Sequence, residues 1–292
     1  MKKRKQAKIM LSLSMIIFGT LGLFTRNIAV ASGELALCRA VLASLLLAGY
    51  FVVKRQKIDF KAIKKELLLL LFSGIAMGIN WILLFEAYKH TTISMATLSY
   101  YFAPVLVTLV CPLLFREKLN KKQIICFVMS TVGLVLIIGF EGVAGKGAHL
   151  PGIMLGLGAA LFYATVILLN KFIKNVEGIQ RTFLQFLAAI IVLAPYVIGT
   201  GGMHLQILDG KGWICLLIVG LIHTGITYCM YFSSLKELRG QEVAILSYLD
   251  PLVAVVVSVL ILGEGITLPQ LIGGILILGF TLWNEKGENV DK

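Results

Sequence analysis

Charged residues are scarce in this chain of 292 residues, because only 14% are Asp, Glu, Lys or Arg, against about 25% in soluble globular proteins. Hydrophobic residues make up 58% of the chain, and its mean hydropathy is +0.91. A soluble fold cannot bury that much apolar surface, so lipid must contact much of the chain. This composition excludes a cytosolic enzyme, a secreted disulfide scaffold, a disordered tail and a collagen-like fibre.

The chain also lacks the short motifs of several catalytic and binding classes. It contains no Gly-x-x-x-x-Gly-Lys-Ser/Thr loop, no His-Glu-x-x-His, no Gly-x-Ser-x-Gly and no aspartate pair within its apolar runs. Its five cysteines lie in apolar runs, with no Cys-x-x-Cys or Cys/His spacing. We therefore expect no enzyme activity, no cofactor and no metal site.

Long apolar runs dominate what is present. A transmembrane helix needs about 17–25 mostly apolar residues, and ten stretches qualify, near residues 9–29, 34–53, 67–88, 93–115, 122–140, 151–173, 180–199, 212–235, 242–262 and 267–284. The basic start and first apolar run also have the outline of a signal peptide, but this run is long enough to span a bilayer. We expect it to be retained, and we predict an all-α integral membrane protein of ten helices.

Lysine and arginine indicate the orientation, because basic residues remain on the cytoplasmic side. With the N-terminus inside, 22 of the 27 fall on that side, and the others are Arg26, Arg39, Lys89, Lys146 and Lys211. This predicts a multi-pass plasma-membrane protein with both termini in the cytoplasm. The basic residues lie in short loops rather than on one folded face, so the net charge of +12 does not indicate nucleic-acid binding.

The sequence repeats itself at an offset of 147 residues. The matched pairs are Gly78 and Gly225, Phe85 and Phe232, Lys89 and Lys236, Tyr101 and Tyr248, Pro104 and Pro251, Glu117 and Glu264, and Gln123 and Gln270. Each half holds five predicted spans, an odd number, so the second half is inverted relative to the first. We predict two inverted five-helix repeats, residues 1–146 and 147–292, with a substrate site near midplane where they meet, as in many secondary transporters.

Several short patterns lie within or at the ends of the predicted spans. They are Ile17-Phe18-Gly19, the run Arg39 to Ala43, the run Ala96 to Tyr101 with Pro104 and Glu117-Lys118-Leu119, and the run Ala244 to Pro251 with Gly263-Glu264. Together with the repeat, they resemble the drug/metabolite transporter superfamily in its EamA-domain branch. The resemblance implies an exporter of amino acids and other small metabolites with a central cavity. The second half has Gly263-Glu264-Gly265 where the first has Arg116-Glu117-Lys118, which fits an outer loop.

An ionisable residue inside a predicted span requires a structural or functional explanation, because a charged side chain is unfavourable in lipid. Asp250 lies near the middle of its span and precedes Pro251, whose ring removes a backbone hydrogen bond. Asp250 is either a proton or cation site, or a group that caps the broken helix or pairs with a neighbouring helix. His223 shares a predicted helix face with Thr227. It either relays protons or binds a carboxylate, or it is a neutral side chain hydrogen-bonded between helices.

Aromatic and polar side chains complete the predicted cavity. Its members are Asn80, Trp81, Tyr100, Tyr101, His223, Thr227, Tyr228, Tyr248 and Asp250, with Pro104 and Pro251 as paired hinges. For Trp81, the alternatives are stacking on substrate and helix packing. Arg39 is expected to extend to the membrane interface, with a contact to Glu34 or to a substrate carboxylate as the alternative. The small residues of Gly74-x-x-x-Gly78 and Gly152-x-x-x-Gly156 predict close helix packing.

The leading functional hypothesis is a secondary active transporter that exports amino acids or related small metabolites by alternating access. Its partners would be the lipid bilayer, a small-molecule substrate and a proton as coupling ion; the sequence leaves a homodimer open. One alternative is an exporter of multiple drugs or organic cations, for which Asp250 would supply the membrane carboxylate. A membrane sensor or scaffold is the alternative from a different class.

Overall fold

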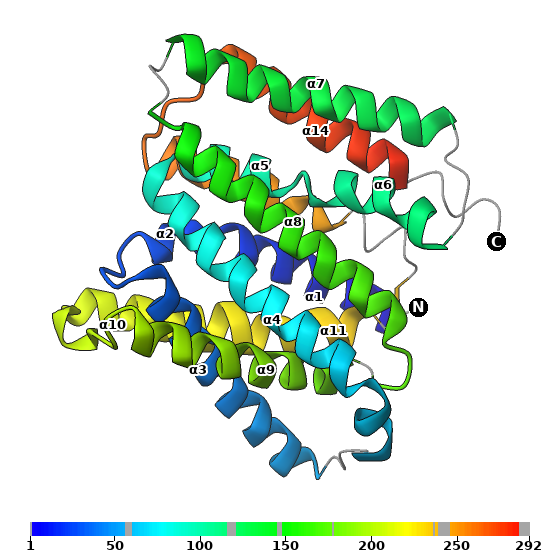
Figure 1. Ribbon diagram of the computed structural model, residues 1–292, viewed down its shortest axis with the longest axis vertical. Helices are drawn as coiled ribbons and strands as arrows, with labels where there is room; N and C mark the ends of the chain where they lie inside the picture. The colour runs from blue at the N-terminus through cyan, green and yellow to red at the C-terminus, as the bar shows by residue number, and fades with distance from the viewer. Residues whose placement is uncertain are drawn as a thin grey trace.

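The computed structural model describes residues 2–55, 60–115, 121–144, 148–176, 178–235, 237–238 and 246–285. Within these ranges the chain forms helices and no strands (Figure 1). In chain order the helices are α1 (Lys2–Gly19), α2 (Leu21–Thr25), α3 (Ser32–Lys54), α4 (Phe60–His90), α5 (Ile93–Tyr100), α6 (Ala103–Phe115), α7 (Lys121–Ala144), α8 (Leu150–Phe172), α9 (Gly178–Gly199), η1 (Leu205–Ile207), α10 (Gly210–Leu217), η2 (Ile218–Ile226), α11 (Thr227–Leu235), α13 (Leu249–Val256), η3 (Val257–Ile261) and α14 (Leu268–Glu285).

Six helical segments in the described residues are long and apolar enough to cross a membrane. They are Lys3–Thr25, Ser32–Lys54, Ile63–His90, Leu150–Phe172, Gly178–Gly199 and Gly210–Ser234, and three shorter apolar helices cover Ile93–Val107, Leu249–Ile261 and Leu268–Trp283. Large apolar side chains such as Val53, Ile198 and Leu260 are at least 75% exposed on the outside of the bundle. Such an exterior is stable only against lipid, and the protein is a membrane protein.

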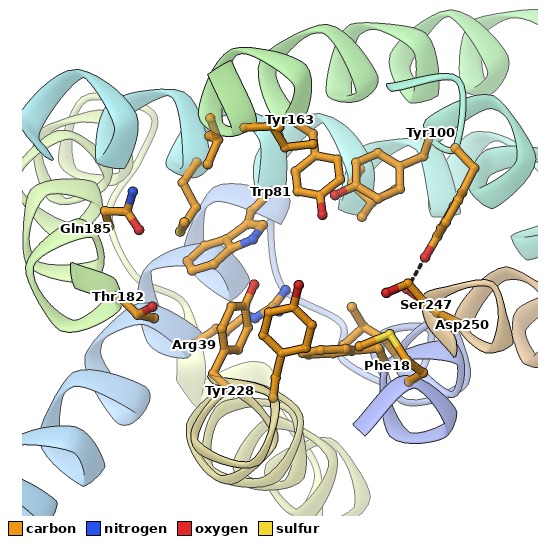
Figure 2. Close-up of a pocket in the computed structure, with 18 of the residues that line it drawn as sticks. Phe18, Arg39, Trp81, Tyr100, Tyr163, Thr182, Gln185, Tyr228, Ser247 and Asp250 are labelled. Atoms are coloured by element: carbon orange, nitrogen blue, oxygen red, sulfur yellow. Dashed lines mark hydrogen bonds between the residues drawn. The ribbon is translucent and has the colours of Figure 1, made fainter. Parts of the chain in front are cut away.

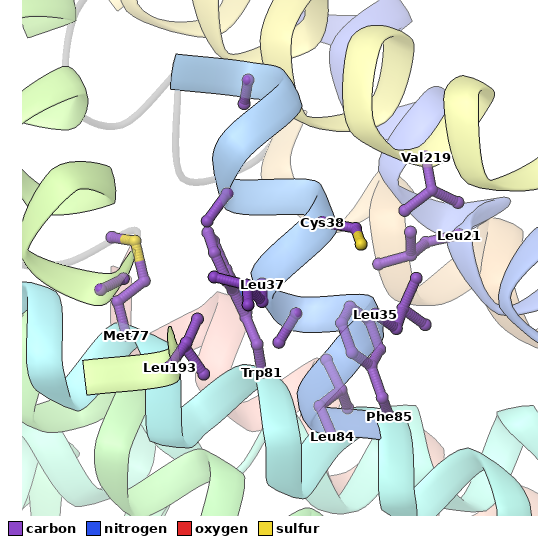
Figure 3. Close-up of a cluster of buried hydrophobic side chains, with 14 of the residues drawn as sticks. Leu21, Leu35, Leu37, Cys38, Met77, Trp81, Leu84, Phe85, Leu193 and Val219 are labelled. Atoms are coloured by element: carbon purple, nitrogen blue, oxygen red, sulfur yellow. The ribbon is translucent and has the colours of Figure 1, made fainter. Parts of the chain in front are cut away.

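The helices pack as a bundle around α4. The most extensive contacts join α4 to α8 and α7 to α14, and α9 contacts both α3 and α4. In Figure 1 the pair α7 and α14 forms one edge of the bundle, and α3, α9 and α10 lie toward the opposite edge. The main apolar core lies between α3, α4 and η2, where Leu37, Phe85 and Val219 are buried (Figure 3).

Small residues allow the central helices to approach closely, as their spacing predicts. A Cβ added to Gly74 in α4 would lie 2.4 Å from the Cβ of Ala188 and 2.5 Å from the carbonyl oxygen of Gln185, both in α9. A Cβ on Gly152 in α8 would lie 2.6 Å from the Cβ of Thr91. The packing interpretation of both glycine motifs is therefore confirmed.

Two helices are interrupted where the sequence predicts continuous spans. The predicted span 93–115 consists of α5 and α6, separated at Tyr101 and Phe102, and Pro104 is the second residue of α6. In the second half, Tyr248 is the N-cap of α13, and Pro251 is the third residue of that helix. Each proline thus occupies the first turn of a new helix, where its missing N–H removes no helical hydrogen bond. Tyr101 and Tyr248, which flank the breaks, are 147 positions apart.

The predicted span 212–235 is not uniformly α-helical. Its middle, η2, is a π-helix between α10 and α11. The hydroxyls of Thr224 and Thr227 donate to the carbonyl oxygens five residues earlier, those of Val219 and Ile222, at 2.8 and 2.7 Å. Because a π-helix has a longer turn than an α-helix, a helix face predicted from the α-helical period does not continue unchanged through this segment into α11.

Candidate functional site

A cavity of about 330 Å³ lies inside the bundle between α1, α2, α3, α4, α5, α8, α9, α11 and α13. It is lined by Met15, Phe18, Leu21, Arg39, Met77, Trp81, Leu84, Tyr88, Thr97, Tyr100, Tyr101, Tyr163, Val166, Ile167, Asn170, Arg181, Thr182, Gln185, Tyr228, Tyr231, Phe232, Ser247 and Asp250. The volume is at the lower end of the roughly 300–1,000 Å³ of ligand sites. The described residues contain no cluster of three His, Cys, Asp or Glu side chains that could hold a metal ion.

Nine of the 23 residues that line the cavity are aromatic, and several of them are drawn in Figure 2. Tyr100 and Tyr163 are stacked, with ring centroids 5.1 Å apart and an interplanar angle of 28°. Tyr228 meets Phe18 and Phe186 edge to face, at 5.2 and 5.4 Å. Such contacts hold each ring in place, so the cavity offers apolar faces with hydroxyl groups at their edges.

Arg39 lies in this wall rather than at the membrane interface. Its side chain is 3% exposed, and Nε donates a hydrogen bond to Thr224 Oγ1 in η2 at 2.5 Å. Its Cζ lies 4.5 Å from the ring centroid of Trp81 and 5.5 Å from that of Phe85. These two rings are one turn apart on α4 and present a single aromatic face, so cation–π attraction adds to the hydrogen bond and keeps the guanidinium inward. The expected interface position of Arg39 is therefore wrong.

Asp250 is the carboxylate of the cavity. Tyr101 donates its phenolic hydrogen to Asp250 Oδ2 at 2.6 Å, a bond marked in Figure 2. The donor follows α5 directly and the acceptor lies in the first turn of α13, so this bond joins the two interrupted helices. Figure 2 shows Asp250 and Arg39 entering the space from different sides.

Five members of the predicted site, Trp81, Tyr100, Tyr101, Tyr228 and Asp250, line this one cavity. Asn80 does not, because its Nδ2 donates to the carbonyl oxygen of Ala159 at 2.6 Å and joins α4 to α8. Tyr248 lines a separate apolar groove beside α14 instead.

His223 and Thr227 are buried beside the cavity rather than in its wall. His223 Nε2 lies 3.0 Å from Thr20 Oγ1, and Nδ1 donates to the Ile218 carbonyl at 3.3 Å. Thr20 is the residue between α1 and α2, so His223 joins η2 to that break. Thr227 is bonded to the backbone of its own helix. His223 therefore hydrogen-bonds between helices, as the second alternative predicts, and Thr227 hydrogen-bonds within its own helix.

Several residues that line the cavity were not predicted from the sequence. Tyr163 and Asn170 are seven residues apart, so they share one face of α8, and Gln185 faces them from α9. Gln185 Nε2 donates to Asn170 Oδ1 at 2.7 Å and lies 2.6 Å from Ser73 Oγ. The spacing of the polar residues in span 151–173 was a signal that could have identified this face.

A polar cluster outside the cavity lining joins loops and helix ends. We call Arg26, Ile93, Ser258 and Glu264 the Glu264 cluster. The Glu264 carboxylate pairs with the Arg26 guanidinium, accepts a hydrogen bond from Ser258 Oγ, and accepts one from the Ile93 backbone N–H at 2.9 Å. The cluster therefore ties the end of α2 and the start of α5 to the loop before α14.

Comparisons with known proteins agree with this architecture. A family model described as the EamA-like transporter family matches the chain twice, over residues 6–139 and 150–284. The uncharacterized transporter YxxF of Bacillus subtilis is 33% identical over 291 residues, which cover 98% of this chain and 93% of that protein. A protein of Salmonella typhimurium named "Probable amino-acid metabolite efflux pump" is 27% identical over 60% of this chain and 62% of its own length.

A solved protein structure is similar over 95% of this chain and 96% of its own, with a TM-score of 0.66 at 17% identity. At that identity the likeness bears on the fold alone. The matching family and the named relatives are transporters rather than enzymes. The family model covers both halves of the sequence, and the cavity draws its walls from both matched segments. The chain belongs to the EamA-like transporter family.

Proposed function

We propose that the protein is a secondary active transporter that exports amino acids or related small metabolites. The observation that carries the proposal is the cavity, a small aromatic-lined space inside a membrane-embedded bundle, with Arg39 and Asp250 in its wall. A free amino acid carries a carboxylate, an ammonium group and often an apolar side chain. Arg39, Asp250 and the aromatic rings of the cavity, respectively, complement these three groups. The Salmonella relative named as an amino-acid metabolite efflux pump supports the same substrate class.

The transport cycle that we propose is alternating access between two inverted five-helix halves, residues 1–146 and 147–292, in a ten-helix bundle. The two matches of the family model and the breaks at Tyr101 and Tyr248, 147 positions apart, support this repeat. Pro104 and Pro251 begin the helices that follow the breaks and are proposed as hinges. We further propose that the chain lies in the plasma membrane with both termini in the cytoplasm.

A second candidate function is the export of organic cations or drugs. The observation in its favour is the Asp250 carboxylate, which lies in an aromatic-lined cavity. Carboxylates and aromatic faces both attract cations. The same carboxylate would carry a proton if proton exchange drives transport.

Counterflow tests both candidates. Purified protein is placed in liposomes that are preloaded with a pool of the twenty amino acids, and the uptake of each labelled amino acid is followed. Protein-free liposomes and the Asp250→Asn variant are the controls. Accumulation of one group of amino acids supports the proposal and identifies the group. If only organic cations accumulate in parallel liposomes, the second candidate replaces it; if neither class accumulates, amino acids and organic cations are both removed as substrates, and other metabolites such as nucleosides and vitamins are tested next.

A further inference from the structure

Arg39 carries a buried positive charge for which the described part of the chain supplies no carboxylate partner. It is 3% exposed, and within the described residues it forms no ion pair with any carboxylate. Asp250, the cavity's carboxylate, accepts its hydrogen bond from Tyr101 instead. A charged side chain within a membrane-spanning segment is unfavourable without a partner, so the missing partner requires an explanation.

The surroundings of Arg39 fix its orientation and leave part of it open. Nε is taken by Thr224 Oγ1, and the flat face of the guanidinium is covered by Trp81. Thr224 is itself held, because its hydroxyl donates to the Val219 carbonyl at 2.8 Å. The structure shows no hydrogen bond from either Nη group to any described residue, and Arg39 lines the cavity.

Two parallel N–H donors on a rigid, planar cation match the two oxygens of a carboxylate. The second arginine of the cavity is differently placed, since Arg181 Nη1 donates to the Asn170 carbonyl at the end of α8. Arg39 is accordingly the better anchor for an anionic group. The stacked rings of Tyr100 and Tyr163 and the ring of Tyr228 then provide surfaces for an apolar remainder.

We infer that Arg39 binds the carboxylate of the transported molecule, and that the substrates are small amphipathic carboxylates, including amino acids with apolar side chains. This inference rests on the proposed function, since it names the recognition group of the same cavity. It assigns the binding determinant to the carboxylate and not to the amine. An amine that lacks a carboxylate would leave the Arg39 charge without a partner and would be a poor substrate.

Binding to the purified full-length protein tests the assignment without requiring transport. Trp81 contacts the Arg39 guanidinium, whereas Trp213 and Trp283 are 41% and 44% exposed on the outside, so quenching of tryptophan fluorescence reports on the site. The ligand pairs are phenylalanine and phenylalaninamide, and 3-phenylpropionate and 3-phenylpropionamide. In each pair the acid and the amide have nearly the same shape and differ in the carboxylate charge.

We expect each acid to bind about 30-fold or more tightly than its amide, the effect of leaving one partner of a buried charge pair unmatched. Arg39→Gln should remove this difference, and Arg39→Lys should keep the preference for the acid with a lower affinity, because the charge remains and the two-donor geometry is lost. Lys211→Gln, at an exposed residue of α10, changes the net charge equally and should bind as the unaltered chain does.

Equal binding of acid and amide to the unaltered chain, or binding of neither, overturns the inference, and this comparison stands even if a variant fails to fold. A full acid preference retained in Arg39→Gln would overturn it as well. Counterflow with the same preparation separates the two proposals. Acid-selective binding without counterflow leaves the carboxylate site and removes the transport function, whereas counterflow that treats acids and amides alike leaves transport and removes the role of Arg39.

Discussion

Replacing Glu264 with glutamine removes the negative charge of the Glu264 cluster while it keeps the size of the side chain. The amide oxygen of the glutamine can still accept the hydrogen bond from the Ile93 N–H, but the ion pair with Arg26 is lost. Arg26 follows α2, whose first residue, Leu21, lines the cavity, and Ile93 is about one turn before the lining residue Thr97. We expect the cluster to close this end of the cavity, which is the outer end in the predicted orientation.

The burial of the pair sets the size of the effect. The Arg26 side chain is 34% exposed and that of Glu264 is 8% exposed. Exposed ion pairs contribute about 0.2–1 kcal/mol, and breaking a buried one costs about 3–5 kcal/mol. A value between these limits, about 1–3 kcal/mol, would shift the balance between closed and open states roughly 5- to 150-fold toward the open state.

Thiol labelling measures this shift. Thr97→Cys, in a chain whose native cysteines are replaced, places a reporter in the cavity wall, and a membrane-impermeant maleimide is applied to right-side-out and inside-out vesicles. Glu264→Gln should raise the labelling rate from the outer face by the factor above. Glu86→Gln is the control, because the ion pairs of Glu86 with Lys89 and His90 lie within α4, and a glutamine oxygen can still accept the hydrogen bond from Ser32 Oγ of α3. An unchanged rate in Glu264→Gln, or an equal rise in both variants, would show that the Glu264 cluster does not hold the cavity closed.

Three further predictions concern proton coupling and packing. Asp250→Asn keeps an acceptor for Tyr101 but cannot take up a proton, so transport into liposomes should lose its response to an imposed pH gradient; an unchanged response would remove Asp250 from proton coupling. Gly74→Ala should destabilise the α4–α9 contact by about 1–3 kcal/mol and lower Tm in detergent, whereas Gly49→Ala, with no atom within 4 Å of the added Cβ, should not; equal Tm values would contradict the close approach. Asn80→Ala should cost about 0.6–2 kcal/mol of stability through the lost bond between α4 and α8 and leave ligand affinity unchanged in the fluorescence titration; a large loss of affinity with unaltered Tm would return this residue to the binding site.

The helical architecture was largely predictable because lipid imposes a simple length and composition rule on spanning helices. The six long apolar helices coincide with predicted spans, and the glycine motifs mark real close contacts. The helix breaks were harder to place. Proline marks them in the sequence, but it does not reveal whether a helix bends through Pro104 or starts again just before it, and the structure shows a new start.

The cavity was predictable where one side chain alone identified it, as with Asp250 and Trp81, and less so where the outcome depended on a distant partner. Arg39 is close to the start of its span, so extension to the interface and burial are equally compatible with its position in the sequence. Its inward direction depends on Trp81 and on Thr224, which is 185 residues away. His223 was likewise expected to face the cavity because it is a polar side chain within a span, but its partners are Thr20, 203 residues away, and a backbone carbonyl of its own helix.

The π-helical segment η2 connects the recognition of an anion to the shape of the bundle. It holds Thr224, which orients the guanidinium of Arg39, and it leads directly into α11, where Tyr228 forms part of the aromatic wall. If this segment tightened to α-helical winding, the residues on its two sides would rotate relative to each other about the helix axis. The Arg39 guanidinium, which Thr224 orients, and the Tyr228 ring would then move apart together. The affinity for a bound carboxylate would fall although no residue of the cavity had been substituted.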